Sequence, residues 1–200
     1  MSVPPRAIQL NEANAFLKKH PEVLYVDLLI ADMNGVVRGK RIERTALHKV
    51  YEKGINLPAS LFALDINGST VESTGLGLDI GDADRICYPI PGTLSVEPWQ
   101  KRPTAQLLMT MHELEGDPFF ADPREVLRQV VTKFDELGLT ICAAFELEFY
   151  LIDQDNVNGR PQSPRSPISG KRPHSTQVYL IDDLDEYVDC LQDILEGAKE

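Results

Sequence analysis

The spacing of hydrophobic residues along the chain predicts a mixture of helices and strands. Apolar residues recur every three or four positions where a helix would bury one face, as Ala13, Phe16 and Leu17 do. Segments rich in β-branched and aromatic residues, bounded by Gly, Pro and Asn, are typical of strands. The predicted helices span residues 11–20, 45–53, 122–137 and 183–199. The predicted strands span residues 23–33, 36–42, 85–89, 95–96, 104–113, 139–152 and 178–181.

Two of these elements carry distinct local signals. Asn34-Gly35 lies between the first two predicted strands, and type I′ hairpin turns prefer this dipeptide. Asp122 precedes Pro123, and Glu125 follows at the third helical position. An acidic N-cap, a proline at the first position and a glutamate at the third predict the start of a helix.

The order of the elements predicts an α+β fold in two domains. A proline-containing linker candidate lies at residues 97–104. Before it we expect a small domain with a mixed sheet over residues 1–103, and after it a second domain over residues 104–200. Polar loops are expected at residues 56–84 and 153–176, where Gly, Pro, Ser and Asp are frequent.

Composition narrows the possible partners. The chain has 200 residues, with 31 acidic against 20 basic ones and a net charge of −11. Such a charge repels nucleic-acid phosphates and anionic membranes, so we expect neither as a partner. No apolar run opens the chain, which predicts no signal peptide or membrane anchor and a cytoplasmic protein. Three widely spaced cysteines predict reduced thiols.

The E-x-E segment, residues 145–151, offers candidate metal ligands. In a strand, Glu146 and Glu148 emerge on one face while Phe145, Leu147 and Phe149 fill the other. Their Cα atoms would then lie about 6.5 to 7 Å apart, which suits two metal ions separated by roughly 3.5 to 4 Å. Hard carboxylate oxygens favour Mg²⁺ or Mn²⁺. An amphipathic strand with a solvated acidic face remains the alternative.

The same stretch resembles the opening of the glutamine synthetase catalytic domain. The resemblance rests on the capped helix at Asp122-Pro123-Arg124, then Gly138, then Phe145-Glu146-Leu147-Glu148-Phe149-Tyr150-Leu151. The upstream half resembles the β-grasp N-terminal domain of that family, with residues 25–42 as its hairpin. The resemblance extends over essentially the whole chain, as the N-terminal portion of such a protein.

The resemblance implies a ligase that uses ATP and Mg²⁺ or Mn²⁺ to join an amine to the γ-carboxylate of glutamate through an acyl phosphate. It implies that Glu146 helps to hold the metal at the ATP phosphates and Glu148 the metal beside glutamate. It implies that Asp65 binds and deprotonates the amine, and that the active site forms between subunits of a homo-oligomer built of stacked rings. Tyr179 matches a position near substrate glutamate loosely.

One departure from the family pattern affects the amine. Glutamine synthetases that use ammonia follow this aspartate with Gly-Ser-Ser, whereas the present chain reads Asp65-Ile66-Asn67-Gly68-Ser69. The surrounding residues resemble the γ-glutamylpolyamine ligase branch, which includes glutamate–putrescine ligase, so the resemblance favours a polyamine. Glu72 or Asp79 is a candidate for the distal ammonium, with solvated loop acids as the alternative.

Two other functions stay open on the sequence. One is a glutamine synthetase that uses ammonia, and the other is a non-catalytic regulatory or binding module with the same fold. Because two carboxylates do not complete two metal shells, we expect these 200 residues alone to bind metal weakly and to be inactive.

Overall fold

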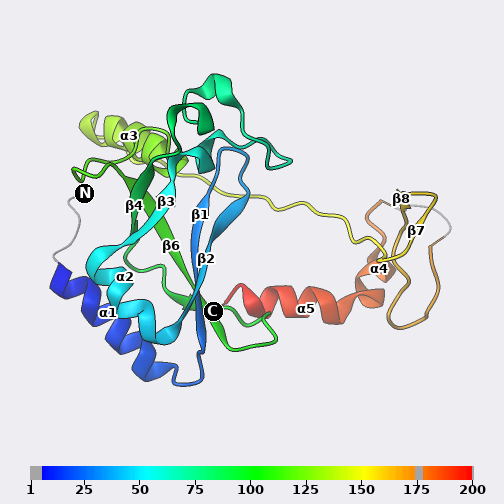
Figure 1. Ribbon diagram of the computed structural model, residues 1–200. Coiled ribbons are helices and arrows are strands. Elements are labelled where there is room, and N and C mark those ends of the chain that lie inside the picture. Colours follow the sequence, from blue (N-terminus) through cyan, green and yellow to red (C-terminus); the bar gives the residue numbers. More distant parts are fainter. Residues whose placement is uncertain (1–5, 174–177, 200) are drawn as a thin grey trace. The chain divides into compact units, whose positions relative to one another are not determined.

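The computed structural model describes residues 6–173 and 178–199 (Figure 1). Its internal contacts divide the chain into two compact units, Met1–Ile141 and Cys142–Glu200. Helices and strands occur together, which confirms the mixed class predicted from the sequence. The division between the units lies well beyond the domain boundary expected at residue 103.

The first unit contains nearly all of the regular sheet. Its helices are α1 (Arg6–Lys19), α2 (Leu47–Lys53) and α3 (Pro123–Glu136). Its strands are β1 (Tyr25–Ala31), β2 (Val37–Glu43), β3 (Ile55–Pro58), β4 (Asp84–Pro89), β5 (Ser95–Val96) and β6 (Thr104–His112). Short 3-10 helices lie at Arg44–Ala46, Ala59–Ala63, Glu72–Thr74 and Leu78–Ile80. Most of these elements were predicted within a few residues, but β3 falls where only a loop was expected.

The sheet has the strand order β2-β1-β6-β4-β3, with β5 also paired to β6. Strand β1 runs parallel to β6, with Tyr25 opposite Thr104 and Leu29 opposite Leu108. The other pairs in this sheet are antiparallel. Strand β6 was expected to open the second domain, yet it is hydrogen bonded in the middle of this sheet. The expected boundary therefore does not separate the two compact units.

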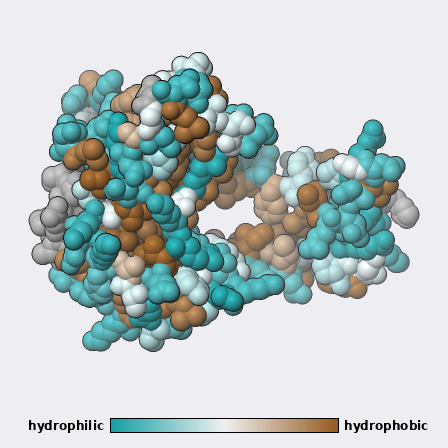
Figure 2. Space-filling view, in the orientation of Figure 1, coloured by the Kyte–Doolittle hydropathy of each residue, from teal (hydrophilic) through white to brown (hydrophobic). Residues whose placement is uncertain are grey.

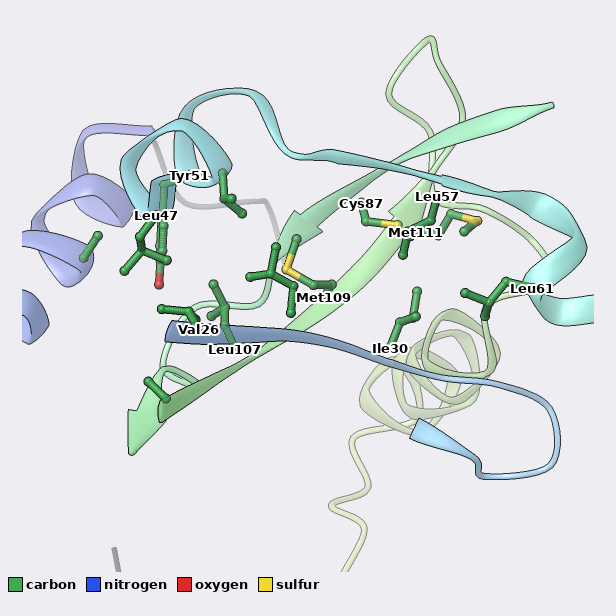
Figure 3. Close-up of a cluster of buried hydrophobic side chains, with 14 of the residues drawn as sticks. Val26, Ile30, Leu47, Tyr51, Leu57, Leu61, Cys87, Leu107, Met109 and Met111 are labelled. Atoms are coloured by element: carbon green, nitrogen blue, oxygen red, sulfur yellow. The ribbon is translucent and has the colours of Figure 1, made fainter. Parts of the chain in front are cut away.

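The core lies against one face of the sheet and is covered by α1, α2 and the 3-10 helix Ala59–Ala63 (Figure 3). Alternate side chains of the central strands point into it, because successive residues of a strand face opposite ways. Helix α2 contributes Leu47, Val50 and Tyr51, all of which are buried. The strand residues in this core are Val26, Leu28, Ile30, Leu57, Cys87, Ala105, Leu107, Met109 and Met111. Each fully buried leucine contributes roughly 1.5 to 3 kcal/mol relative to an exposed one.

The turn between β1 and β2 is not the type I′ turn that Asn34-Gly35 predicted. A type I′ turn needs positive φ at both central residues, but of this pair Gly35 alone has a positive φ, at 75°. The backbone N–H of Gly35 donates to Asp32 O at 3.1 Å, and that of Asp32 donates to Val36 O at 3.0 Å. The result is a longer turn over residues 32–36 with glycine in the left-handed position, here called the hairpin turn.

A buried aspartate joins α3 to the sheet. Asp122 is 1% exposed, and its Oδ1 accepts the backbone N–H of Arg124 at 2.9 Å as the N-cap of α3. Its Oδ2 accepts the backbone N–H of Met111 at 2.9 Å and the hydroxyl of Thr110 at 3.0 Å, both from β6. The predicted N-cap is therefore confirmed, and the same carboxylate also fixes the helix to the central strand.

The second unit has little regular structure. It contains the strands β7 (Asn156–Val157) and β8 (Arg160–Pro161) and the helices α4 (Ile181–Glu186) and α5 (Val188–Gly197). Ser166 and Ser169 both donate to the Glu186 carboxylate, which ties the loop before α4 to that helix. The strand predicted at residues 178–181 is wrong, since Ile181 begins a helix. The predicted last helix is divided at Tyr187, where φ is −124°.

Hydrophobic surface remains exposed on both units (Figure 2). On α3 the exposed apolar residues are Val126, Leu127, Val130 and Phe134. Among the described helices, none combines the length and the apolar character that a membrane span requires.

Candidate active site

Asp65 lies in a closed loop whose backbone it holds in place. The Asp65 loop, residues 64–70, is closed by a bridge between Leu64 and Thr70. Asp65 Oδ1 accepts the backbone N–H groups of Asn67 at 2.8 Å and Ser69 at 2.9 Å. No partner for Oδ2 is found among residues 6–173 and 178–199. The partly exposed carboxylate therefore keeps one oxygen available to a cationic ligand.

The hairpin turn contacts this loop through a side chain. Asn34 Nδ2 donates to the carbonyl oxygen of Leu64 at 2.8 Å. Asp32, which is 2% exposed, holds the turn by accepting the backbone N–H groups of Asn34 at 2.8 Å and Val36 at 2.9 Å. Its other oxygen accepts Arg38 Nε at 2.7 Å.

The charge of Asp32 is stabilised in spite of its burial. Burial by itself raises the pKa of Asp32, but the hydrogen bond from Arg38 and those from the Val36 and Asn34 backbone outweigh it. The net effect is a lowered pKa. The hairpin turn therefore contains a buried carboxylate that is ionised and fully hydrogen bonded.

Glu72 is engaged by its own loop. Its two carboxylate oxygens accept the backbone N–H groups of Leu78 at 3.3 Å and Asp79 at 3.2 Å. The backbone of Gly77 passes so close that an added Cβ would lie 2.0 Å from Glu72 Oε2. This arrangement gives Glu72 a structural role at the start of the 3-10 helix Leu78–Ile80. Its candidacy as an ammonium ligand has no support in these contacts.

The strand predicted at residues 139–152 does not form. The E-x-E segment has no strand partner among the described residues, and Phe145 is 93% exposed while Leu147 is 87% exposed. Both Glu146 and Glu148 are exposed as well. A strand needs a neighbour for its backbone N–H and C=O groups. The amphipathic pattern shows which side chains would be buried, but it does not supply the surface that would cover them.

The other predicted ligands are not gathered into a metal site. Within the described part of the chain, no group of three or more His, Cys, Asp or Glu side chains is placed to hold a metal ion. Tyr179 is 97% exposed and has a positive φ of 60°. Asp65 belongs to the first unit, whereas Glu146, Glu148 and Tyr179 belong to the second. The side chains of Glu146 and Glu148 have the chemistry that Mg²⁺ prefers, but two carboxylates are only part of a coordination shell.

Comparisons with known proteins identify the family. The profile described as "Glutamine synthetase, catalytic domain" matches residues 120–200. The gamma-glutamylputrescine synthetase of Escherichia coli (strain K12) is 41% identical over 189 residues, which cover 94% of this chain and 40% of that protein. The chain belongs to the glutamine synthetase family.

Further similarities agree with membership in the glutamine synthetase family. The glutamate–isopropylamine ligase of a Pseudomonas species is 33% identical over 147 residues, which cover 72% of this chain and 32% of that protein. A crystal structure described as a novel glutamine synthase homolog matches with a TM-score of 0.51 and 21% identity, over 57% of this chain and 27% of that one. At that identity the structural match supports the fold alone. The chain spans about 40% of the length of the Escherichia coli relative.

Two features of this glutamine synthetase-family chain were missed on the sequence. One is the contact from Asn34 to the Asp65 loop, and the other is the buried, paired state of Asp32. The letters Asp32-Met33-Asn34-Gly35 indicate a turn, and an aspartate at that position often binds the backbone two residues ahead. No local signal indicates which distant carbonyl the asparagine reaches.

Proposed function

We propose that the whole protein uses ATP to join an amine to the γ-carboxylate of glutamate, and that a polyamine such as putrescine is the favoured amine. The observation that carries the proposal is the 41% identity to a gamma-glutamylputrescine synthetase over 94% of the chain. The geometry of Asp65 adds support, because its Oδ1 is held by two backbone N–H groups while Oδ2 has no partner in the described structure. A carboxylate in this state suits a cationic amine.

The proposed reaction has two steps. A γ-carboxylate oxygen of glutamate attacks the γ-phosphorus of ATP, so that an O–P bond forms and ADP leaves. The amine nitrogen then attacks the acyl carbon, a C–N bond forms, the C–O bond to the phosphoryl group breaks, and phosphate leaves with the second proton of the nitrogen. The amine arrives as an ammonium ion, and Asp65 accepts its proton before the attack.

Metal ions are part of the proposal through Glu146 and Glu148. Mg²⁺ or Mn²⁺ bound there would neutralise charge on the phosphates and the substrate carboxylate. This pair alone is expected to bind metal weakly, and titration calorimetry of the present chain with Mn²⁺ measures this. A tight site in the present chain would contradict that expectation.

The remaining expectations for the whole protein form part of the same proposal. They are a β-grasp-like N-terminal domain, contact of Tyr179 with glutamate, attraction of the distal ammonium by Glu72 or Asp79, and a homo-oligomer of stacked rings. Because Glu72 already binds two backbone N–H groups, Asp79 is the freer of the two acids to meet a ligand. Light scattering of the full-length protein measures the oligomer.

The test is phosphate release by the full-length protein with glutamate, ATP and one amine at a time. Putrescine is expected to give the largest kcat/KM, above ammonium and isopropylamine. If ammonium gives the largest value, the protein is a glutamine synthetase. If no amine stimulates phosphate release, the non-catalytic alternative holds and the proposal fails.

Asp65→Asn separates the catalytic carboxylate from the loop that it holds. The amide oxygen of asparagine keeps the acceptor for Asn67 and Ser69, whereas the proton acceptor is lost. The expected loss in kcat/KM for the amine is roughly 100-fold to 10,000-fold. The matched control is Asp117→Asn, at an exposed aspartate of the same unit, which is expected to change kcat/KM less than about twofold.

A further inference from the structure

The hairpin turn is a rigid platform beside the Asp65 loop. Its buried carboxylate, Asp32, accepts hydrogen bonds from Asn34 N, Val36 N and Arg38 Nε at 2.8, 2.9 and 2.7 Å. The Asp32 side chain is wholly inaccessible to solvent. Buried charge held by several hydrogen bonds fixes the geometry of the groups around it. The backbone of Asn34 is therefore held within the β1–β2 hairpin, and β1 in turn pairs with β6 of the sheet.

The side chain of Asn34 extends from this platform to the backbone of another segment. Its Nδ2 donates to Leu64 O at 2.8 Å, across a sequence separation of 30 residues. Leu64 directly precedes Asp65 and forms the bridge with Thr70 that closes the Asp65 loop. The neighbouring attachment of this loop is the hydrogen bond from Val71 N to Ala63 O at 2.8 Å. Asn34 thus holds the carbonyl adjacent to Asp65 from outside the loop.

We propose that Asn34 is a positioning residue for Asp65, acting through the hydrogen bond to Leu64 O. This inference rests on the proposed role of Asp65 toward the amine. Asp65 Oδ1 is already committed to Asn67 N and Ser69 N, so the direction of its free Oδ2 follows the orientation of the whole loop. A displacement of about 1 Å in a reacting group can cost about 100-fold in rate. The hydrogen bond next to Asp65 therefore determines how well Oδ2 is oriented toward the amine.

The structural part of the inference is tested in the present chain without any activity. Asn34→Ser removes Nδ2 and shortens the side chain so that the hydroxyl no longer reaches Leu64 O, and serine remains compatible with a turn. Asn34→Asp keeps the side-chain shape but cannot donate. Amide hydrogen exchange by NMR is measured at Asn67 and Ser69. Both variants are expected to accelerate exchange there roughly twofold to tenfold, the range that one neutral hydrogen bond supports. The control Asn14→Ala removes another exposed asparagine contact, to His48 at 2.6 Å, and is expected to leave these amides unchanged.

The functional part is tested by steady-state kinetics of the full-length variants. Asn34→Ser is expected to lower kcat/KM for the amine about tenfold, while KM for ATP and for glutamate changes less than about twofold. A general loss of structure would change the KM values for all three substrates. The Asn14→Ala control is expected to show none of these effects.

The outcomes separate the two proposals. If the wild-type protein turns over no amine, the proposed function fails, and the exchange experiment still decides whether Asn34 orders the Asp65 loop. If the wild type is active but the variants exchange and react as it does, Asn34 is not a positioning residue. If exchange accelerates while all three KM values rise together, the role of Asn34 is structural and the inference is overturned.

Discussion

The variant Asp122→Ala is expected to destabilise the first unit more than the replacement of an exposed acidic residue by alanine. Asp122 caps α3 through Arg124 N, and losing such a cap costs about 1 kcal/mol. The substitution also leaves the buried N–H of Met111 unpaired, at a cost of roughly 1 to 3 kcal/mol. The hydroxyl of Thr110 loses a bond worth about 1 kcal/mol. The expected loss of unfolding free energy is roughly 3 to 5 kcal/mol, a large part of the about 5 to 15 kcal/mol of a typical domain.

Urea unfolding of the chain, followed by far-UV circular dichroism, measures this loss. Asp122→Asn keeps an oxygen acceptor for Arg124 N but places an NH₂ group where Met111 N needs an acceptor. Its loss of unfolding free energy is therefore expected to be about half that of Asp122→Ala. Asp117→Ala, at an exposed site, is expected to stay within about 0.5 kcal/mol of the wild type. If Asp122→Ala unfolds at the same urea concentration as Asp117→Ala, the carboxylate does not join helix and sheet as described.

Two further predictions concern the first unit, and a third compares Cys87 of the first unit with Cys142 of the second. Burial by itself raises the pKa of Asp32, but the ion pair with Arg38 and the two backbone N–H groups lower this pKa by more, so that the net shift is downward. The ionised Asp32 therefore contributes stability above about pH 4, and this contribution is lost as pH falls through the folded pKa. Urea unfolding at several pH values should show that the unfolding free energy of Asp32→Asn falls less steeply in acid than that of the wild type. In Gly39→Ala the new Cβ would lie 1.7 Å from Leu28 O at a φ of +154°, and the same assay should show a loss above about 3 kcal/mol. A thiol reagent should modify exposed Cys142 in the native chain and Cys87 only after unfolding, since burial raises the pKa of Cys87 to about 12.

Local patterns predicted most elements of the first unit, though not β3, because the causes of those elements are local. Residues close together in the sequence determine the alternation of inward side chains in β1 and β6 and the Asp122 cap of α3. The turn type was wrong because a side chain decided it. The Asp32 carboxylate binds the N–H groups of Asn34 and Val36, which favours the longer turn over the two-residue one that Asn34-Gly35 suggests.

The candidate site was harder to predict because it depends on distant segments. The alternation in the E-x-E segment is compatible with a strand, but pairing comes from a neighbouring strand that the pattern does not specify. The ligand roles of Glu146 and Glu148 therefore remain predictions. The role of Asp65 also remains a prediction, although its hydrogen bonds to Asn67 and Ser69 give its loop a defined shape.

The parallel pairing of β1 with β6 has a consequence for how the chain reaches its native state. The β1–β6 pair cannot form until Thr104 and the rest of β6 are available to pair with Tyr25 and the rest of β1. Contacts between such distant segments slow folding, because the intervening chain has to be ordered first. During synthesis the β1–β2 hairpin would leave the ribosome with Val26, Leu28 and Ile30 still uncovered. Refolding from denaturant should therefore compete with aggregation, and its yield should fall as protein concentration rises.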